Sequence, residues 1–225
     1  MNKIIQSELL NAISGIAHGF LTRQFGKDQA KGISVPVCRM KQVHGNDVLC
    51  VENVSDLEKY RQYPSDIVLT SLPNIALTIS TADCVPLLFC DPIKKVIAAA
   101  HAGWRGTAKN VAKTTVLALQ KKFGCVSQNV VVAIGPSIQD CCYEVDQTVY
   151  DQISQKDFFK PTMHNPGHWM LSLPHVNNHQ LIKAGVSKDH IWISPLCTAC
   201  HLDQFYSYRK EGEKAGRQWS FIALK

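Results

Sequence analysis

Short runs of apolar residues, separated by turn residues, recur along the chain and predict a series of β-strands. The runs 85-VPLLFC-90, 96-VIAAA-100 and 129-NVVVAIG-135 are almost continuously apolar. A strand covered on both faces has this composition, because neither side of it contacts water. Weaker strand patterns occur at residues 37–43, 47–54, 75–80, 190–194 and 217–224.

The sequence also predicts helices, the clearest of which begins after Gly106. Apolar side chains recur there with the period of one helix face, at Ala112, Val116, Leu119 and Phe123. Thr107 is expected to cap the amino end of this helix, and Gly124 is expected to end it. Further helices are expected at 146–156 and 174–184. Because strands outnumber helices and do not alternate with them strictly, we expect an α/β (α+β) single-domain layered fold, with mixed β-sheets flanked by helices.

Length, composition and charge are those of an ordinary globular domain. The chain has 225 residues, of which 45% are hydrophobic and 19% charged, and it lacks repeats and a Pro/Gly/Ser linker. One domain over residues 1–225 is the simplest interpretation. The formal charge of +6 arises from 24 basic and 18 acidic residues spread along the chain. Without a Lys/Arg block, this charge fits small anionic substrates at least as well as nucleic acid, and we expect no nucleic-acid partner.

The amino-terminal segment 1–20 carries one early lysine but lacks the clean apolar core of a signal peptide. No run reaches the roughly 18–20 apolar residues that span a bilayer. We therefore expect a cytoplasmic protein with no membrane partner. In a reducing compartment its nine cysteines are thiols that fill the core, bind metal or act in catalysis.

Three polar segments lie beside predicted strands and carry the residues best suited to chemistry. They are 41-KQVHGND-47, 81-TADC-84 and 98-AAAHAGWRGTAKN-110. The first two apolar runs are predicted to form a hairpin around the turn 91-DPIKK-95. In that hairpin Cys84 and His101 are neighbours at the open end, whereas strand pairing does not place His44. Cys90, which ends its apolar run, is expected to be a core thiol.

Taken singly, each of these residues is more simply a structural histidine or a core thiol. If His44, Cys84 and His101 converge, two chemistries are open. Two imidazoles and one thiolate hold zinc with an open fourth position, and the same ligands suit copper. Alternatively, His101 activates Cys84 as a thiolate nucleophile without a metal.

The segment 197-CTACH-201 offers a rival site. Its pattern matches c-type haem attachment, but that chemistry needs an exported protein. A structural zinc on Cys197 and Cys200 would need a second cysteine pair, and none stands at the usual spacing. We therefore interpret this segment as a tight turn with partly buried thiols.

The adjacent segment 203–221 mixes aromatic side chains with fixed cations, namely Tyr206, Tyr208, Arg209 and Arg217. This mixture suits a base or ring beside a phosphate, although a solvated hairpin has the same pattern. The chain lacks G-x-G-x-x-G after a strand, G-x-x-x-x-G-K-[ST], G-x-S-x-G and H-E-x-x-H. Rossmann redox chemistry, nucleoside-triphosphate hydrolysis and the common serine-hydrolase scheme are therefore disfavoured.

Several stretches, in order along the chain, resemble the laccase-domain or polyphenol-oxidase family, whose members are also described as purine nucleoside phosphorylases and as peptidoglycan editing factors. They are 18-HGFLTR-23, 42-QVHGNDV-48, 81-TADCVPLLFCD-91, 99-AAHAGWRGTAKNV-111, 134-IGPSIQDCCYEV-145, and 197-CTACHLDQFYSYR-209 with 216-GRQ-218. The loop 24-QFGKDQAKGISVPV-37 departs from the family's usual Gly-Gly-Val-Ser-like loop. A substrate contact from that loop is therefore not carried over.

The resemblance implies a layered α/β fold and a catalytic zinc (or copper) site made by His44, Cys84 and His101. It implies phosphorolysis of adenosine, inosine and methylthioadenosine, and deamination of adenosine, with a nucleoside and phosphate as small-molecule partners. Asp83 is expected either to shuttle a proton or to order its loop. We expect the substrate to contact the cations Arg39, Arg105 and Arg209 and the ring of Tyr206.

Three other functions stay open. A hydrolase that removes a wrong amino acid from a peptidoglycan precursor, a UDP-sugar conjugate, would use the same basic pocket. A copper polyphenol oxidase is disfavoured in its multicopper form, because the nine histidines form no H-x-H pair and only three residues resemble ligands. A metal-stabilised scaffold without catalysis would need a fourth protein ligand.

Overall fold

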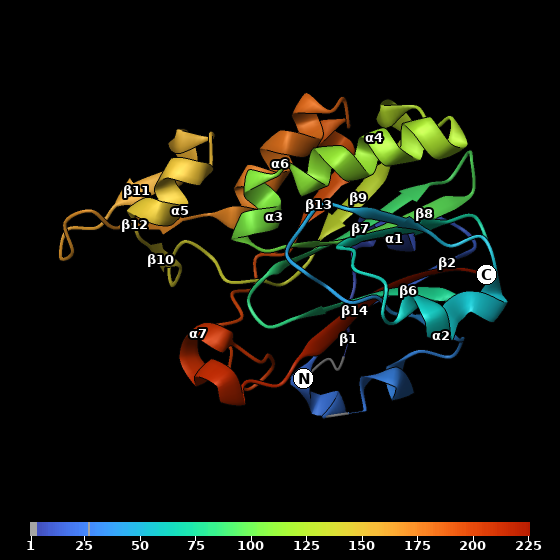
Figure 1. Ribbon diagram of the computed structural model, residues 1–225, viewed down its shortest axis with the longest axis horizontal. Helices are drawn as coiled ribbons and strands as arrows, with labels where there is room; N and C mark the ends of the chain where they lie inside the picture. The colour runs from blue at the N-terminus through green and yellow to red at the C-terminus, as the bar shows by residue number, and fades with distance from the viewer. Residues whose placement is uncertain (1–3, 27) are drawn as a thin grey trace.

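The structure, a computed structural model, describes residues 4–26 and 28–225. Within them two β-sheets stack face to face, and helices cover the outer face of the larger sheet (Figure 1). The larger sheet has the order β13 (Ile191–Ile193), β9 (Val131–Ile134), β7 (Val85–Asp91), β8 (Val96–Ala102), β5 (Ile67–Thr70) and β4 (Val48–Cys50). The second sheet has the order β1 (Ile4–Ile5), β2 (Ile16–Leu21), β14 (Gln218–Leu224), β6 (Ala76–Thr81) and β3 (Val37–Cys38).

A small third sheet projects to one side, together with α5 (Figure 1). Its strands are β10 (Glu144–Val145), β12 (Trp169–Leu171) and β11 (Phe159–Pro161). The helices are α1 (Glu8–Asn11), α2 (Leu57–Tyr60), α3 (Trp104–Ala108), α4 (Val111–Phe123), α5 (Gln147–Gln152), α6 (Leu173–Lys183) and α7 (Tyr208–Glu211). Among the described residues, no helix is long and apolar enough to cross a membrane.

Both large sheets are mixed. In the larger one, β9, β7, β8 and β5 pair antiparallel, whereas β13 and β4 join its edges in parallel. In the second sheet only β3 pairs in parallel, with β6. The layered α/β fold with mixed sheets flanked by helices is therefore confirmed.

The central strands are apolar throughout because both of their faces are covered. Along β7, Val85, Leu87 and Phe89 pack in the cluster beneath α4 and α6. Leu88 and Cys90 point the other way, into the core between the two sheets. Cys90 is fully buried there, and burial raises the pKa of its thiol to about 12. The prediction that Cys90 is a core thiol is confirmed.

The predicted hairpin is also confirmed. Strands β7 and β8 pair antiparallel with Val85 opposite Ala102 and Pro86 opposite His101. Residues 92–95 form the turn at the closed end. Cys84 immediately precedes β7, so the open end brings it beside His101.

The helical segment after the hairpin differs from the prediction. It consists of two helices, α3 and α4, separated by Lys109 and Asn110, and Asn110 adopts a left-handed φ of 59°. Thr107 does not cap α4, because it lies inside α3, where it is buried and accepts a hydrogen bond from the Asn177 amide at 3.0 Å. Gly124 ends α4 with a φ of 64°, as expected.

Strand β2 gave no clear strand signal because it contains His18 and Gly19. The glycine is required by packing, since a Cβ there would lie 2.5 Å from the Ile4 side chain and 3.0 Å from Phe221. Strand propensity underrates such a position, because a glycine normally weakens a strand. Here it leaves room for the side chains of Ile4 and Phe221, from the two strands that pair with β2.

The divergent loop 24–37 packs on the outer face of the second sheet through Phe25, Ile33 and Val35. The Gln29 amide oxygen accepts a hydrogen bond from the Trp219 N–H at 3.2 Å. Lys27 lies outside the described residues. None of the loop's described residues lines the cavity that holds His44, Cys84 and His101. The loop's contacts are with the second sheet.

Candidate metal centre and substrate cavity

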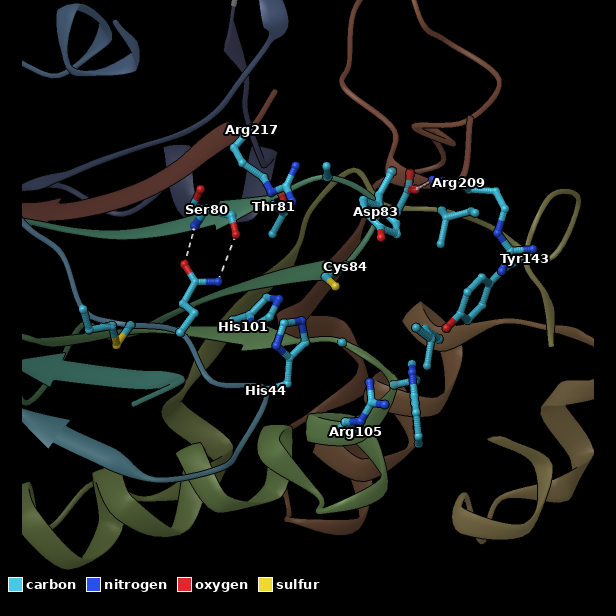
Figure 2. Close-up of a pocket in the computed structure, with 18 residues that line it drawn as sticks. His44, Ser80, Thr81, Asp83, Cys84, His101, Arg105, Tyr143, Arg209 and Arg217 are labelled. Atoms are coloured by element: carbon cyan, nitrogen blue, oxygen red, sulfur yellow. Dashed lines mark hydrogen bonds between the residues drawn. The ribbon is translucent and has the colours of Figure 1, made fainter. Parts of the chain in front are cut away.

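A cavity of about 710 Å³ opens where β6 and β8 end and β7 begins, beside α3 and α7 (Figure 2). Its volume lies in the range of small-molecule sites. The lining is Met40, Gln42, His44, Ser80, Thr81, Ala82, Asp83, Cys84, His101, Gly103, Trp104, Arg105, Ile138, Tyr143, Leu173, Tyr208, Arg209 and Arg217. The three chemically reactive residues predicted from the sequence are therefore all on its wall.

His44, Cys84 and His101 converge in this cavity. One potential ligand atom from each lies within 4.8 Å of the others, and the two imidazole rings meet edge to face with centroids 4.8 Å apart. His44 comes from the loop before β4, Cys84 from the residue before β7, and His101 from β8. Figure 2 shows the three side chains pointing toward one another.

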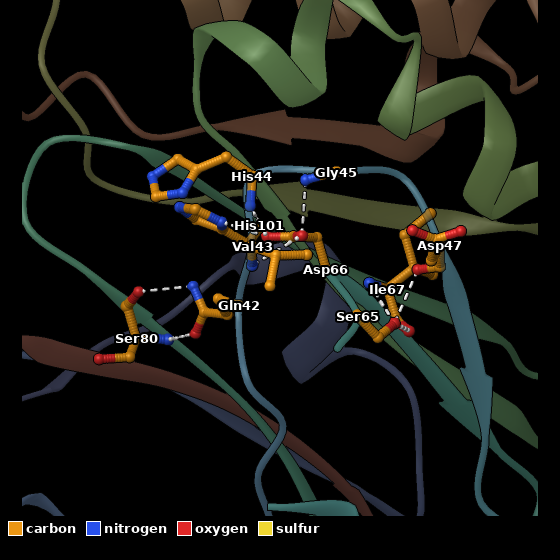
Figure 3. Close-up of polar contacts among 10 residues, drawn as sticks. All are labelled: Gln42, Val43, His44, Gly45, Asp47, Ser65, Asp66, Ile67, Ser80 and His101. Atoms are coloured by element: carbon orange, nitrogen blue, oxygen red, sulfur yellow. Dashed lines mark hydrogen bonds and ion pairs between the residues drawn. The ribbon is translucent and has the colours of Figure 1, made fainter. Parts of the chain in front are cut away.

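Asp66, immediately before β5, holds two of these three residues in place (Figure 3). Its carboxylate accepts hydrogen bonds from the backbone N–H groups of Val43, His44 and Gly45 at 3.1, 3.1 and 2.7 Å. The same carboxylate lies 2.7 Å from Nδ1 of His101. Its side chain is fully buried, so water does not compete for these bonds.

The loop before β4 has an unusual backbone conformation at His44, with a φ of 60°. A residue other than glycine seldom adopts this left-handed conformation, and its cost must be offset by surrounding contacts. The three N–H bonds to Asp66 supply them. Gln42 adds a second anchor, because its amide makes two hydrogen bonds to the backbone of Ser80, at 2.9 and 2.8 Å (Figure 3).

The electrostatics of the cluster favour a thiolate. Burial by itself raises the pKa of Cys84, but the neighbouring His101 and His44 outweigh it and lower the pKa to about 6. Burial likewise opposes a proton on His101, yet Cys84 and Asp66 raise its pKa to about 9. Both directions favour a thiolate on Cys84 paired with an imidazolium on His101 when no metal is bound. A thiolate is both the metal-ligand form and the nucleophilic form of cysteine.

The donor set and its setting fit a single metal ion. Asp66 engages Nδ1 of His101, which leaves Nε2 for a metal, and such a carboxylate partner is usual for metal-bound histidine. Gly103 makes room, since a Cβ there would lie 3.1 Å from both Cys84 Sγ and the His44 ring. His44 is exposed and Cys84 half-buried. A fourth position can therefore open to the cavity, as catalytic zinc sites require.

Asp83 lies beside Cys84 with a φ of 85°. Its carboxylate accepts hydrogen bonds from the Thr198 hydroxyl at 2.6 Å, the Ser207 hydroxyl at 3.0 Å and the Arg209 N–H at 2.7 Å. Both oxygens are thus engaged as acceptors from two distant segments. This arrangement favours the loop-ordering role over the proton shuttle.

The predicted substrate contacts divide into two groups. Arg105 and Arg209 line the cavity: Arg105 stacks on Trp104 at 4.1 Å, and Arg209 lies 5.2 Å from the Tyr143 ring centroid. Arg39 and Tyr206 are not part of the lining. Arg39 stacks on Trp219, and Arg23 stacks on Tyr206 at 4.6 Å.

Sequence reasoning missed Asp66, Gln42 and Tyr143. Asp66 precedes a short apolar strand, where an aspartate has the pattern of an ordinary turn residue. Gln42 lies in the predicted motif, but its two backbone bonds span 38 residues. Tyr143 lies in the resembling stretch 134–145, and that placement was its only available signal.

The fold and site together define a layered α/β protein with an open His₂Cys cluster in a cation-lined cavity. Over residues 23–225 the chain matches the family described as "Multi-copper polyphenol oxidoreductase laccase", and it belongs to that family. It is 34% identical over 192 residues to a purine nucleoside phosphorylase YlmD of Bacillus subtilis, covering 82% of this chain and 69% of that protein.

Other relatives carry the same description. A purine nucleoside phosphorylase of Bacteroides thetaiotaomicron is 37% identical over 163 residues, covering 71% of this chain and 60% of that protein. The human purine nucleoside phosphorylase LACC1 is 29% identical, covering 83% of this chain and 43% of that protein. The chain thus matches less than two thirds of the length of each of these two relatives.

Solved structures share the whole fold. The hypothetical protein YfiH of Bacillus licheniformis superposes with a TM-score of 0.88 at 28% identity, with both chains fully covered. YlmD from Geobacillus stearothermophilus gives a TM-score of 0.85 at 27% identity, covering 100% of this chain and 97% of that chain. The architecture described above is therefore that of the family.

Proposed function

We propose that this chain is a zinc-dependent purine nucleoside phosphorylase that acts on adenosine, inosine and methylthioadenosine and also deaminates adenosine. The observation that carries the proposal is the convergence of His44, Cys84 and His101 in a cavity that arginines also line. The relatives described as purine nucleoside phosphorylases support the same class of substrate.

In phosphorolysis a phosphate oxygen bonds to C1′ of the ribose while the bond from C1′ to the purine nitrogen breaks. The electron pair of that bond goes to the purine, which takes up a proton, and ribose 1-phosphate is the second product. Arg105 and Arg209 line the cavity and would hold the phosphate, because a guanidinium matches its oxygens in geometry and charge.

The purine needs a flat apolar surface beside these cations. Tyr143 and Trp104 offer one on the cavity wall. Burial raises the pKa of Tyr143 beyond its usual range, so its hydroxyl keeps its proton at neutral pH and can donate a hydrogen bond to a ring nitrogen. Aromatic stacking of a base contributes roughly 1–3 kcal/mol.

A zinc ion on His44, Cys84 and His101 would supply Lewis acidity at the cavity wall. Asp66 would keep the His101 imidazole and the His44 backbone in place, and the thiolate of Cys84 would lower the net charge of the centre. Deamination fits the same arrangement, because it needs a water oxygen to bond to C6 of adenine as ammonia leaves. These ligands also suit copper, so the metal itself must be measured.

The test is a product screen on metal-free and zinc-reloaded protein. Adenosine, inosine and methylthioadenosine are each incubated with inorganic phosphate, and the free bases and sugar phosphates are separated by chromatography. Deamination is measured separately, as the formation of inosine from adenosine in the absence of phosphate. We expect each activity to disappear on chelation and to return with Zn²⁺. Full activity after complete chelation would overturn the metal mechanism.

Two further substrates separate the competing functions in the same screen. A UDP-sugar–amino-acid conjugate that releases free amino acid, with no purine product from the nucleosides, would replace the proposal by precursor editing. Oxidation of a phenol with bound copper, and again no purine product, would replace it by polyphenol oxidation. In either case the nucleoside proposal fails.

A further inference from the structure

A second cluster of potential metal ligands lies outside the cavity. Cys141 and Cys142 follow β9, and Cys197 and Cys200 follow β13. Potential ligand atoms of all four lie within 4.8 Å of one another. From the sequence, residues 197–201 are interpreted as a tight turn with partly buried thiols, because no second cysteine pair stands at the usual spacing. The adjacent cysteines Cys141 and Cys142 supply that second pair in space.

Backbone pairing brings the two segments together. Ser137 and Cys197 form an isolated parallel bridge, in which the Thr198 N–H donates to the Ser137 carbonyl at 3.1 Å. Strands β9 and β13, which lead into these segments, are themselves parallel neighbours. Parallel strands end at the same edge of a sheet, so the segments that carry the four thiols leave the sheet side by side.

The sulfur positions match a single tetrahedral ion. Cys200 Sγ lies 3.6 Å from Cys141 Sγ and 3.4 Å from Cys142 Sγ, and the latter two sulfurs are 3.8 Å apart. Four thiolates at about 2.3 Å from a zinc ion are separated from each other by about 3.8 Å. A disulfide needs a separation of about 2.05 Å and would use only two of the four.

The surroundings of the fourth sulfur, that of Cys197, suit a thiolate ligand. The thiol is 4% exposed, and the Gln139 N–H donates to its Sγ at 3.4 Å. N–H groups that point at sulfur stabilise its negative charge and orient it toward a metal. Ile138 and Ala199 cover the cluster on its inner side, whereas Cys141 and Cys200 face solvent.

We propose that Cys141, Cys142, Cys197 and Cys200 bind one zinc ion in a closed four-thiolate site with a structural role. Four protein ligands leave no open position, which is the arrangement of structural rather than catalytic zinc. This site is separate from the cavity cluster and does not depend on the proposed function.

The position of the site suggests which part of the structure the ion would stabilise. Each of the two segments that it would join also supplies one partner of Asp83: the Ile138 N–H donates to the Asp83 carbonyl, and the Thr198 hydroxyl donates to its carboxylate. Tyr143 follows the first segment directly, and Arg209 follows the second. The ion would therefore brace the part of the cavity wall that carries Asp83, Tyr143 and Arg209.

The experiment counts metal in the full chain after removal of the cavity ligands. A His44→Ala/Cys84→Ser variant, purified under reducing conditions and supplied with Zn²⁺, is expected to retain about one ion per chain. Adding Cys197→Ser and Cys200→Ser is expected to reduce this to about zero, whereas adding Cys50→Ser, a half-buried thiol outside both clusters, should leave it unchanged.

Cobalt substitution identifies the ligands. In the His44→Ala/Cys84→Ser background, Co²⁺ should give the strong thiolate charge-transfer and visible bands of a tetrahedral four-sulfur site, lost when Cys142 is changed to serine. Absence of bound metal in the reduced protein would overturn the proposal. So would a disulfide between any two of these cysteines in the freshly purified chain, detected by mass spectrometry without reductant.

Discussion

Asp66 and His101 are joined twice, through a 2.7 Å contact between Oδ1 and Nδ1 and through a 2.8 Å hydrogen bond from the His101 N–H to the Asp66 carbonyl. The same carboxylate holds the backbone of His44. One buried acid thus fixes two of the three candidate metal ligands. Burial by itself opposes ionisation of Asp66, but the bonds from His101 and from Gly45 outweigh it and keep the pKa of the carboxyl below its usual value.

Replacing Asp66 with asparagine should therefore weaken metal binding without removing a ligand. An amide can accept fewer of the N–H bonds and no longer carries the charge that supports His101. Loss of such a partner typically lowers metal affinity about 10–100-fold. Zinc affinity is measured by competition with a chromophoric chelator, and Asp189→Asn, an exposed site, serves as control. Equal affinity in wild type and Asp66→Asn would contradict this role.

Gly103→Ala tests the space around the cluster. The backbone φ of −71° suits alanine, but the new Cβ would lie 3.1 Å from Cys84 Sγ and from the His44 ring. Overpacking of this kind costs about 1–3 kcal/mol. We expect this cost to destabilise the zinc-bound protein more than the metal-free protein. The zinc-induced rise in melting temperature should shrink. Gly45→Ala, whose nearest contact is 3.4 Å, should keep the full rise; the same loss in both variants would refute the argument.

Replacing Arg105 and replacing Arg39 should affect the KM for phosphate differently. Arg105 lines the cavity and Arg39 does not, although the sequence nominated both. A hydrogen bond to a charged group contributes roughly 1.5–3 kcal/mol. Arg105→Gln should therefore raise the KM for phosphate by about tenfold or more, while Arg39→Gln leaves it within about twofold. A larger rise in the KM for phosphate in Arg39→Gln than in Arg105→Gln would contradict a phosphate site beside Arg105.

His18 predicts a pH dependence of stability. Its Nε2 accepts a hydrogen bond from the Ser7 N–H at 2.9 Å, and burial lowers its pKa to about 4. The unfolded chain takes up this proton below pH ~6.5, so the stabilising contribution is present above that pH and is lost as the pH falls toward 4.

The matched variant is His18→Gln, which can accept the same bond but does not titrate. Urea unfolding at pH 7.5 and pH 4.5 gives the free energy of unfolding of both proteins. Wild type should lose more stability than the variant between the two pH values. Parallel losses would show that His18 is not the group responsible.

The pairing of Cys84 with His101 was predictable because it is local. An apolar run, a turn and a second apolar run define a hairpin, and a hairpin fixes which residues face each other. His44 could be added only through the family resemblance. It lies in a loop whose contacts with Asp66 join residues far apart in the sequence. The split between α3 and α4 depends on one left-handed residue, Asn110, which periodicity does not reveal.

Asp66 and the four-cysteine cluster escaped prediction for a related reason. Each connects segments that are far apart in the chain: Asp66 bonds to residues 21 and 35 positions away, and Cys141 meets Cys200 across 59 positions. Such contacts follow from sheet order, in particular from the parallel pairing of β9 with β13. No motif spacing in one sequence encodes that order.

The central claim is that His44, Cys84 and His101 hold a zinc ion on which nucleoside phosphorolysis depends. It is tested most directly by measuring zinc content and ribose 1-phosphate formation in Cys84→Ser beside Cys50→Ser. We predict that Cys84→Ser binds one zinc fewer per chain than wild type and forms no product from inosine and phosphate, while Cys50→Ser matches wild type in both. Undiminished zinc content or undiminished phosphorolysis in Cys84→Ser would contradict the claim.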